Sequence, residues 1–330
     1  MKQSILAAYL GIFIIFVMSF FLGEAPRIPV PSSSPTISIA ASPSPVSTPE
    51  TAETQTPQTI RVKHGEEIYD AGLEEYLVGV LAAEMPADFE PEALKAQAVA
   101  ARSYTLYCAR SGKHGEAQVC TDFSCCQAWK NEEEMRSSWG ENFEEKHKKI
   151  SEAVYDTAGE YLVYEGEPIF AAFHSSSCGL TESCGAIWSE LPYLVSVTSP
   201  ESKDNVPGYI SHVEVSPLDF RDTLLHACPQ ADFSGSESSW IGSVNPEKSG
   251  RVDSAELGGV LYSGTKLREL FSLRSTAFTL EYTGESFLFT VTGFGHGVGM
   301  SQYGAEVMAA EGSDYTAILA HYYPGTSLVS

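Results

Sequence analysis

Positive charge is scarce in this 330-residue chain, in which 20 lysine and arginine residues stand against 43 aspartate and glutamate residues, giving a formal net charge of −23. The acidic residues are spread along the chain beyond its first segment. This distribution argues against nucleic acid as a partner, because a phosphate backbone is bound by a basic surface. Internal repeats with a period of about twenty to fifty residues are also missing, so solenoid and propeller folds are not expected.

Charge of either sign is absent from residues 3–23, and residues 5–22 are almost wholly apolar. This run is long enough to span a bilayer as a helix. A cleaved signal peptide is the alternative, but its apolar core is usually shorter and its amino end more basic than the single Lys2 found here. We therefore predict an uncleaved transmembrane anchor over residues 1–23. Lys2 on the short side predicts a single-pass protein of the cell membrane whose C-terminal domain is extracytoplasmic.

Residues 24–59 are rich in proline, serine and threonine and show no apolar periodicity. They predict a semi-extended linker, which at about 3 Å per residue reaches on the order of 100 Å. Residues 60–330 then form the folded part, for which we expect an α+β class: an N-terminal helical part packed against antiparallel β-sheet lobes. Short apolar and alternating runs predict strands at 161–164, 169–173, 193–197, 278–282 and 287–291, and closing helices are expected at 305–312 and 314–322.

One carboxylate falls where a negative charge is disfavoured. Apolar residues spaced by three and four predict one buried helix face, formed by Leu73, Tyr76, Leu77, Val80 and Leu81. The next step along that face is Glu84, and Pro86 ends the helix soon afterwards. Burial and the carboxyl end of the helix dipole should both raise the pKa of Glu84. Such a group suits a general acid, and the alternative is a half-exposed glutamate at a fraying helix end.

A second helix is predicted to begin at Pro91, since proline is favoured in the first helical turn. Lys95 and Arg102 are seven residues apart and therefore share one face of it. Two cations beside a buried acid could orient a polar substrate. A solvated stripe is the alternative and the commoner situation for these residue types.

Four soft metal ligands lie within thirteen residues, namely His114, Cys120, Cys125 and Cys126. Three thiolates and one imidazole would close a tetrahedral structural zinc site. The spacing is not that of a standard zinc knuckle, and disulfides are permitted outside the cytoplasm. Spacing alone therefore leaves zinc and a disulfide open.

Four motifs occur in a characteristic order along the chain: Glu84-Met85-Pro86, the run ALKAQAVAARSY at 93–104, FHSS at 173–176 and GHGVGMSQYGA at 295–305. Together they resemble the stage II sporulation protein D family, which includes the amidase-enhancer relatives, from about residue 60 to the C-terminus. The resemblance implies a lytic transglycosylase of peptidoglycan with Glu84 as the catalytic residue. It also implies that Lys95 and Arg102 occupy positions needed for activity, which we interpret as substrate binding.

The remaining site residues are expected to form the groove for the glycan strand. His174 and His296 each lie in a turn rich in glycine or serine, and we expect them to shape the groove by hydrogen bonding. Ser176 and Tyr193 are expected to line it as well, although burial in the core is the simpler account of Tyr193. Another local pair, Cys178 and Cys184, could form a disulfide.

The resemblance also bears on the metal, because some members of the family bind zinc in this insert through two cysteines and two histidines. Here Cys125 stands where a histidine is expected, a change that zinc tolerates. Engulfment during sporulation, with stage II sporulation proteins P and M as partners, is implied too. Two alternative functions are open: a non-catalytic amidase-enhancing module that binds glycan, and a zinc-dependent hydrolase in which water replaces one metal ligand.

Overall fold

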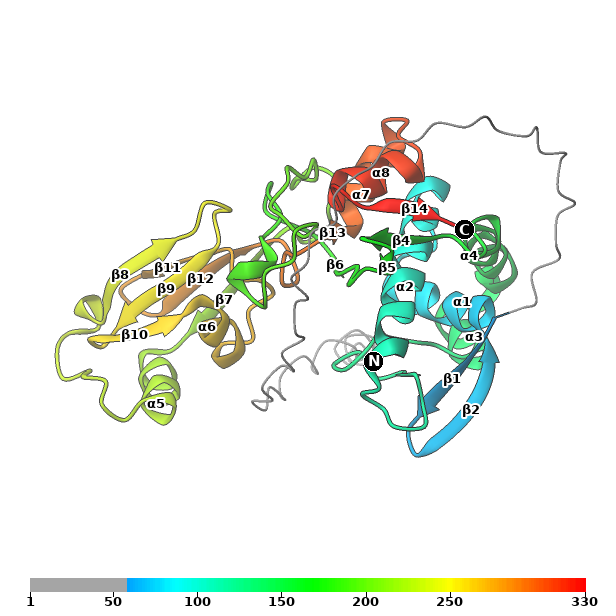
Figure 1. Ribbon diagram of the computed structural model, residues 1–330. Helices are drawn as coiled ribbons and strands as arrows, with labels where there is room; N and C mark the ends of the chain where they lie inside the picture. Colours follow the sequence, from blue (N-terminus) through cyan, green and yellow to red (C-terminus); the bar gives the residue numbers. More distant parts are fainter. Residues whose placement is uncertain (1–57) are drawn as a thin grey trace, which may run out of the picture.

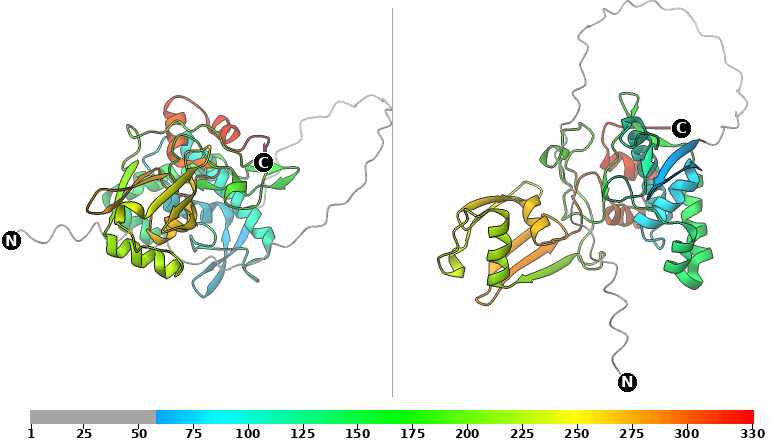
Figure 2. Two further views of the ribbon diagram at one scale, coloured as in Figure 1. Left: turned by 90° about the vertical axis from the view of Figure 1, so that its left-hand side faces the viewer. Right: turned by 90° about the horizontal axis from the view of Figure 1, so that it is seen from below.

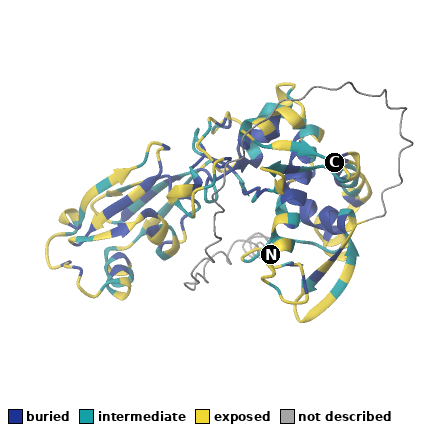
Figure 3. Ribbon diagram, viewed as in Figure 1, coloured by how far each residue is buried: buried dark blue, intermediate teal, exposed yellow. Residues whose placement is uncertain are grey.

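The structure is a computed structural model that describes residues 58–330, arranged as two lobes (Figures 1 and 2). Each lobe has its own buried core (Figure 3): residues 60–194 and 298–323 supply the first, and residues 220–291 the second. The predicted anchor at 1–23 and nearly all of the predicted linker lie outside the described residues. Within the described part, none of the helices combines the length and the apolar character that crossing a membrane requires.

A single long helix organises the first lobe. α2 (Pro91–Ser111) packs against α1 (Leu73–Glu84), α4 (Phe143–Asp156), α7 (Gln302–Ala310) and α8 (Tyr315–Tyr322). The inward face of α2 carries several alanines with no exposed surface, and their small side chains let the surrounding helices approach closely. As predicted, α2 begins with Pro91, and it ends at Gly112, whose φ of 65° is left-handed. The predicted helices near the C-terminus are confirmed as α7 and α8.

Short strands and one further helix complete the first lobe. The hairpin of β1 (Thr59–His64) and β2 (Glu67–Gly72) is extended by β3 (Val119–Cys120), which runs parallel to β1. α3 (Glu132–Trp139) starts with a capping box at Asn131. β4 (Tyr161–Tyr164), a predicted strand, lies between two antiparallel neighbours, β5 (Glu167–Pro168) and β14 (Ser327–Val329).

The second lobe contains two antiparallel sheets of three strands each. The first has the order β10–β9–β8, formed by Val260–Ser263, Val252–Leu257 and Ile241–Pro246. The second has the order β11–β12–β7, formed by Phe278–Tyr282, Phe287–Thr292 and Ile210–Val215. This lobe also contains two α-helices, α5 (Pro217–Ala227) and α6 (Gly264–Leu270).

Stacked aromatic rings fill the core of the second lobe. Phe220 from α5 lies on Phe287 of β12 with ring centroids 3.9 Å apart, and Trp240 lies 5.6 Å from Phe287 in a nearly parallel plane. Residues 287, 289 and 291 are all fully buried while their neighbours are partly exposed. This alternation is what predicted the strands at 278–282 and 287–291, and both are confirmed.

Two strands of two residues each pair at the junction of the lobes. β6 (Phe173–His174) pairs in parallel with β13 (Met300–Ser301), which lies just after the point where the chain returns from the second lobe to the first core. Gly299 is required here, because a Cβ at this position would lie 1.9 Å from the carbonyl oxygen of Ala172. The junction thereby brings the FHSS and GHGVGMSQYGA motifs together.

Two predicted strands are wrong. Of residues 169–173 only Phe173 lies in a strand, and residues 193–197 form none. In the first segment the N–H groups of Ala171 and Ala172 bond to carbonyls two residues earlier, at Ile169 and Phe170, which makes consecutive tight turns. Apolar side chains in these segments reflect burial of an irregular loop rather than a place in a sheet.

Candidate functional site

Glu84 is the last residue of α1 and lies beside Met85, whose extended backbone ends the helix before Pro86. Its side chain is half-buried, and Oε1 accepts a hydrogen bond of 2.7 Å from the backbone N–H of Ala128. The backbone carbonyl of Glu84 accepts a hydrogen bond of 3.1 Å from Nε2 of Gln302, the first residue of α7. Glu84 is thus held by segments that follow it by 44 and 218 residues in sequence.

Burial raises the pKa of Glu84 to about 7, and the hydrogen bond from Ala128 opposes this shift only in part. Among residues 58–330 no other charged group contributes to the shift. A carboxyl group with this pKa is protonated in about half of the molecules at neutral pH. The upward shift of the Glu84 pKa agrees with the prediction made from the helix pattern, and desolvation is its main cause.

The segment from Gln127 to Lys130, here called the strap, crosses α1 and presents the Ala128 N–H to Glu84. The Lys130 N–H bonds to the carbonyl of Gly79 in the middle of α1, and the Gln127 amide donates to the Thr105 hydroxyl on α2. A Cβ at residue 79 would lie 2.2 Å from Nε1 of Trp129. Glycine is therefore needed for the strap to lie on the helix, a requirement that the sequence analysis missed.

The four predicted metal ligands come together immediately before the strap. Their ligand atoms all lie within 4.8 Å of one another, with His114 Nε2 3.2 Å from Cys126 Sγ and 3.7 Å from Cys125 Sγ. A tetrahedral zinc ion with bonds of about 2.0–2.3 Å places its ligands about 3.3–3.8 Å apart, so the group fits such an ion after small adjustments. Thiolate-rich donors favour zinc over magnesium or calcium.

All seven cysteines of the chain are free thiols in the structure. The cysteines of the insert are therefore not bridged in the structure, and their grouping with His114 is the arrangement that the metal alternative needs. Cys178 and Cys184 are not bridged either, since the first thiol donates to the carbonyl of Ser249 and the second to that of Ser189.

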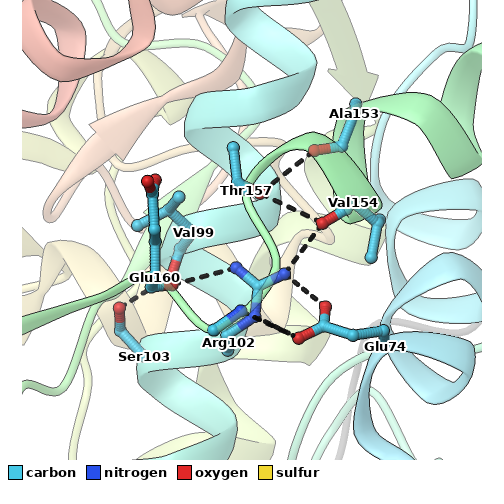
Figure 4. Close-up of polar contacts among 9 residues, drawn as sticks. Glu74, Val99, Arg102, Ser103, Ala153, Val154, Thr157 and Glu160 are labelled. Carbon is cyan, nitrogen blue, oxygen red and sulfur yellow. Dashed lines mark hydrogen bonds and ion pairs between the residues drawn. The ribbon is translucent and has the colours of Figure 1, made fainter. Parts of the chain in front are cut away.

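Arg102 does not face a substrate, and the structure corrects that expectation (Figure 4). Its side chain has no exposed surface, and Nε donates to Glu74 Oε1 at 3.0 Å. Nη1 donates to the carbonyl of Glu160 at 2.9 Å, and Nη2 donates to the carbonyl of Val154 at 3.1 Å and also to Glu74 Oε2. Every nitrogen of the guanidinium is used inside the protein, where it ties α2 to α1 and to the end of α4.

Lys95 lies on the same face of α2, as predicted, but that face is turned toward α4. Its Nζ is 3.3 Å from a carboxylate oxygen of Glu92 and 3.3 Å from one of Asp156. The side of α2 that approaches Glu84 instead carries Gln97, whose amide oxygen is 3.5 Å from Gln302 Nε2. Residues two apart on a helix point in nearly opposite directions, so Lys95 is directed away from the acid.

The junction of the lobes places the two predicted histidines side by side, with ring centroids 5.7 Å apart. Burial lowers the pKa of His296 to about 3 and that of His174 well below its usual value, so both imidazoles are neutral at physiological pH. His174 Nδ1 lies 3.2 Å from the Val298 carbonyl and so carries the proton, while His296 Nδ1 accepts from the Val298 N–H. His174 is buried, whereas His296 is partly exposed.

Ser176 and Tyr193 are interior residues, and neither lines an open surface. The backbone N–H of Ser176 bonds to the carbonyl of Phe294, which fixes the junction. Tyr193 is 5% exposed, and its hydroxyl oxygen accepts a hydrogen bond from the Phe170 N–H. For Tyr193 the alternative of core burial is the one that the structure supports.

The sequence analysis also missed Arg251, which reaches from the second lobe into the junction. It is 1% exposed, and a Cβ on Gly297 would lie 2.4 Å from its Cζ, so the guanidinium lies directly against that glycine. Its charge, together with that of Arg268, contributes to the low pKa of His296. No feature of the sequence near residue 251 signals this role, because it depends on the packing of the two lobes.

Comparison with known proteins places this geometry in context. Residues 62–164 match a family described as "Stage II sporulation protein". Stage II sporulation protein D of Bacillus subtilis (strain 168) is 40% identical over 261 residues, which cover 78% of this chain and 74% of the relative, and that of Bacillus amyloliquefaciens is 39% identical with the same coverage. The amidase enhancer of Bacillus subtilis is 29% identical over 77% of this chain but only 40% of its own length.

Proposed function

Because the chain belongs to the stage II sporulation protein D family, we propose that it is a lytic transglycosylase acting on peptidoglycan. It cleaves the bond between N-acetylmuramic acid and N-acetylglucosamine in glycan strands, during engulfment in sporulation. The observation that carries the proposal is the Glu84 carboxyl, whose pKa is raised to about 7 at the end of α1. Such a group is available both as an acid and as a base near neutral pH.

Glu84 serves both proton transfers of the reaction. As the acid it donates its proton to the glycosidic oxygen while the bond from that oxygen to C1 of the muramic acid breaks. The 6-hydroxyl of the same sugar then attacks C1 and closes a 1,6-anhydro ring, and its proton passes to the Glu84 carboxylate. The acid is regenerated, and no water is consumed.

The desolvated setting of Glu84 supports this reaction over hydrolysis. Glycosidases that use water, or a nucleophile of their own, place two carboxylates around the bond. The raised pKa of Glu84 comes from burial, and no carboxylate among residues 58–330 is a cause of it, as one in direct contact with Glu84 would be. An intramolecular hydroxyl as nucleophile makes a second carboxylate unnecessary.

The Ala128 N–H holds one oxygen of Glu84, and so directs the carboxyl group. When bound, zinc at His114, Cys120, Cys125 and Cys126 would supply structural cross-linking. Four protein donors leave no coordination position for a reacting water, so we assign no chemical step to the metal. Arg102 and Lys95 support the reaction indirectly, by fixing α2 against α1 and α4.

We also propose that residues 1–23 anchor the protein in the cell membrane and that residues 24–59 are the linker to an extracytoplasmic catalytic domain at 60–330. A tether with a reach on the order of 100 Å suits an enzyme that must enter the wall while remaining on a membrane. Stage II sporulation proteins P and M are the proposed partners.

A second candidate function is a module that enhances an amidase without cleaving glycan, favoured by the 29% identity with the amidase enhancer. Mass spectrometry of products from defined glycan strands separates the candidates. The proposed enzyme yields 1,6-anhydro ends, which are lighter than reducing ends by one water. Reducing ends would indicate hydrolysis, and intact strands together with a faster amidase would support the second candidate.

A further inference from the structure

Glu201 is a buried carboxylate in the loop before β7, and the proposed reaction does not use it. Its residue is 3% exposed. Oε1 accepts hydrogen bonds from the backbone N–H of Ser177 at 2.6 Å and from the hydroxyl of Ser301 at 2.5 Å. Oε2 accepts one from the hydroxyl of Ser199 at 2.5 Å. One carboxylate therefore joins three segments: the chain after β6, its own loop and the start of α7.

The hydroxyl of Ser301 connects Glu201 to the first turn of α7. Ser301 is the N-cap of this helix, and its Oγ accepts a hydrogen bond of 3.1 Å from the Gly304 N–H. The hydroxyl proton goes to Glu201 at 2.5 Å rather than to the Ser175 carbonyl at 3.4 Å, which leaves a lone pair for that N–H. A carboxylate beside the N-terminus of a helix also has the sign that the helix dipole favours. Glu201 thus fixes how α7 begins.

The packing of α7 on Glu201 is close. A Cβ at Gly304 would lie 2.8 Å from Glu201 Oε2. The same Cβ would lie 2.4 Å from Ser199 Oγ and 2.0 Å from the hydroxyl of Tyr322 on α8. The Ser199 and Tyr322 hydroxyl oxygens are themselves 2.7 Å apart. Because α7 lies directly on these oxygen atoms, a change at Glu201 is transmitted to the helix.

α7 in turn holds both ends of the segment at residues 84–90. Gln302, which follows Ser301, donates to the backbone carbonyl of Glu84 at 3.1 Å. About one turn further along α7, a carboxylate oxygen of Glu306 accepts a hydrogen bond of 2.6 Å from the Glu90 N–H. The backbone that carries the acid is therefore attached to the helix that Glu201 fixes.

We propose that Glu201 is a positioning residue for Glu84, acting through the start of α7. The inference rests on the proposed function, in which Glu84 donates a proton to the glycosidic oxygen and later accepts one from the 6-hydroxyl. Proton transfer requires heavy atoms about 2.6–3.2 Å apart. A small displacement of Glu84 therefore slows the reaction more than it weakens the binding of the strand.

Steady-state kinetics of 1,6-anhydro end formation on defined glycan strands, with the full chain in detergent micelles, test the inference. Glu201→Ala should lower kcat about 10- to 100-fold and change KM less than about twofold, because the residue acts on the geometry of the reacting groups. Glu201→Gln keeps an oxygen acceptor and should retain more of kcat than Glu201→Ala.

The matched control is Glu182→Ala, which removes a similar carboxylate from the same junction. Glu182 is 4% exposed and accepts a hydrogen bond of 2.5 Å from the Ser249 hydroxyl and one of 2.8 Å from the Ser183 N–H. Within residues 58–330 these hydrogen bonds do not reach α7. Glu182→Ala should therefore lower stability without lowering kcat.

Amide hydrogen exchange measures the same link without cleavage. Glu201→Ala should speed exchange at the Glu90 amide, whose partner Glu306 lies on α7, and Glu182→Ala should leave that exchange unchanged. Absence of 1,6-anhydro ends from the unmodified protein would refute the proposed function, and the exchange measurement would still decide whether Glu201 controls residues 84–90.

A kcat near that of the wild type in Glu201→Ala, with the variant folded by circular dichroism, would overturn the inference. An equal loss of kcat in Glu182→Ala would also overturn it, because the loss would then be a general effect of a damaged junction. If Glu201→Ala does not fold, Ser301→Ala removes the connecting hydroxyl instead. It should lower kcat with KM nearly unchanged, and an unchanged kcat in this variant would overturn the inference.

Discussion

The raised pKa of Glu84 predicts that this residue destabilises the folded protein at alkaline pH. The folded state favours the protonated carboxyl, so the contribution of Glu84 to the free energy of unfolding is fully present below the ordinary pKa of about 4.5. It is lost as the pH rises through the folded-state value of about 7. At about 1.4 kcal/mol per pH unit the loss is about 3.5 kcal/mol, which partial exposure of the side chain reduces to about 2 kcal/mol.

Glu84→Gln tests this prediction because glutamine keeps an oxygen acceptor for the Ala128 N–H but cannot ionise. Urea denaturation of both proteins between pH 5 and pH 8 should show similar stability at the acidic end and an advantage of about 2 kcal/mol for the variant at the alkaline end. Glu311→Gln is the matched control, since Glu311 also ends a helix (α7) but is exposed. A wild-type and variant pair with parallel pH profiles would refute a buried, protonated Glu84.

Three further predictions follow from the contacts around the site. Arg102→Ala should lower the free energy of unfolding by about 3 kcal/mol, because it removes the guanidinium that the Glu74 carboxylate and two backbone carbonyls bind. Lys95→Ala, on the same face of α2, should lower it by less than about 1 kcal/mol. Equal losses of stability for the two variants in chemical denaturation would contradict the burial of Arg102. In metal analysis of the purified proteins, Cys120→Ser should have lost its bound zinc and Cys125→His should have retained it. Wild-type protein that carries no zinc would contradict the proposed metal site. Gly79→Ala should displace the strap and speed hydrogen exchange at its amides, with unchanged exchange as the contrary result.

How far the site could be predicted depended on whether its signal was local. Glu84 was predictable because its helix face and the proline that ends the helix lie within a few turns of it. The metal ligands were predictable because they are close in sequence. The direction of Lys95 and Arg102 was not, since a shared face says nothing about which neighbour that face meets. Only the packing of α4 and of residues near Glu160 turns those two cations away from Glu84.

The fold shows the same division between local and distant causes. The strands at 278–282 and 287–291 alternate regularly because one side of each is buried. Residues 169–173 and 193–197 are apolar because the chain crosses the interior there as an irregular loop, and composition alone does not distinguish this from a strand. The burial of Arg251 could not be predicted from nearby residues, because it depends on the return of the chain at Gly297, which packs against the guanidinium.

The central claim is that Glu84 alone carries the proton transfers of glycan cleavage. The most direct test is the rate at which 1,6-anhydro ends form on defined glycan strands, compared by mass spectrometry between the wild-type protein and Glu84→Gln. Loss of the general acid and base should reduce this rate at least about 10²–10⁴-fold while strand binding persists. Formation of 1,6-anhydro ends by the variant at a rate near that of the wild type would contradict the claim.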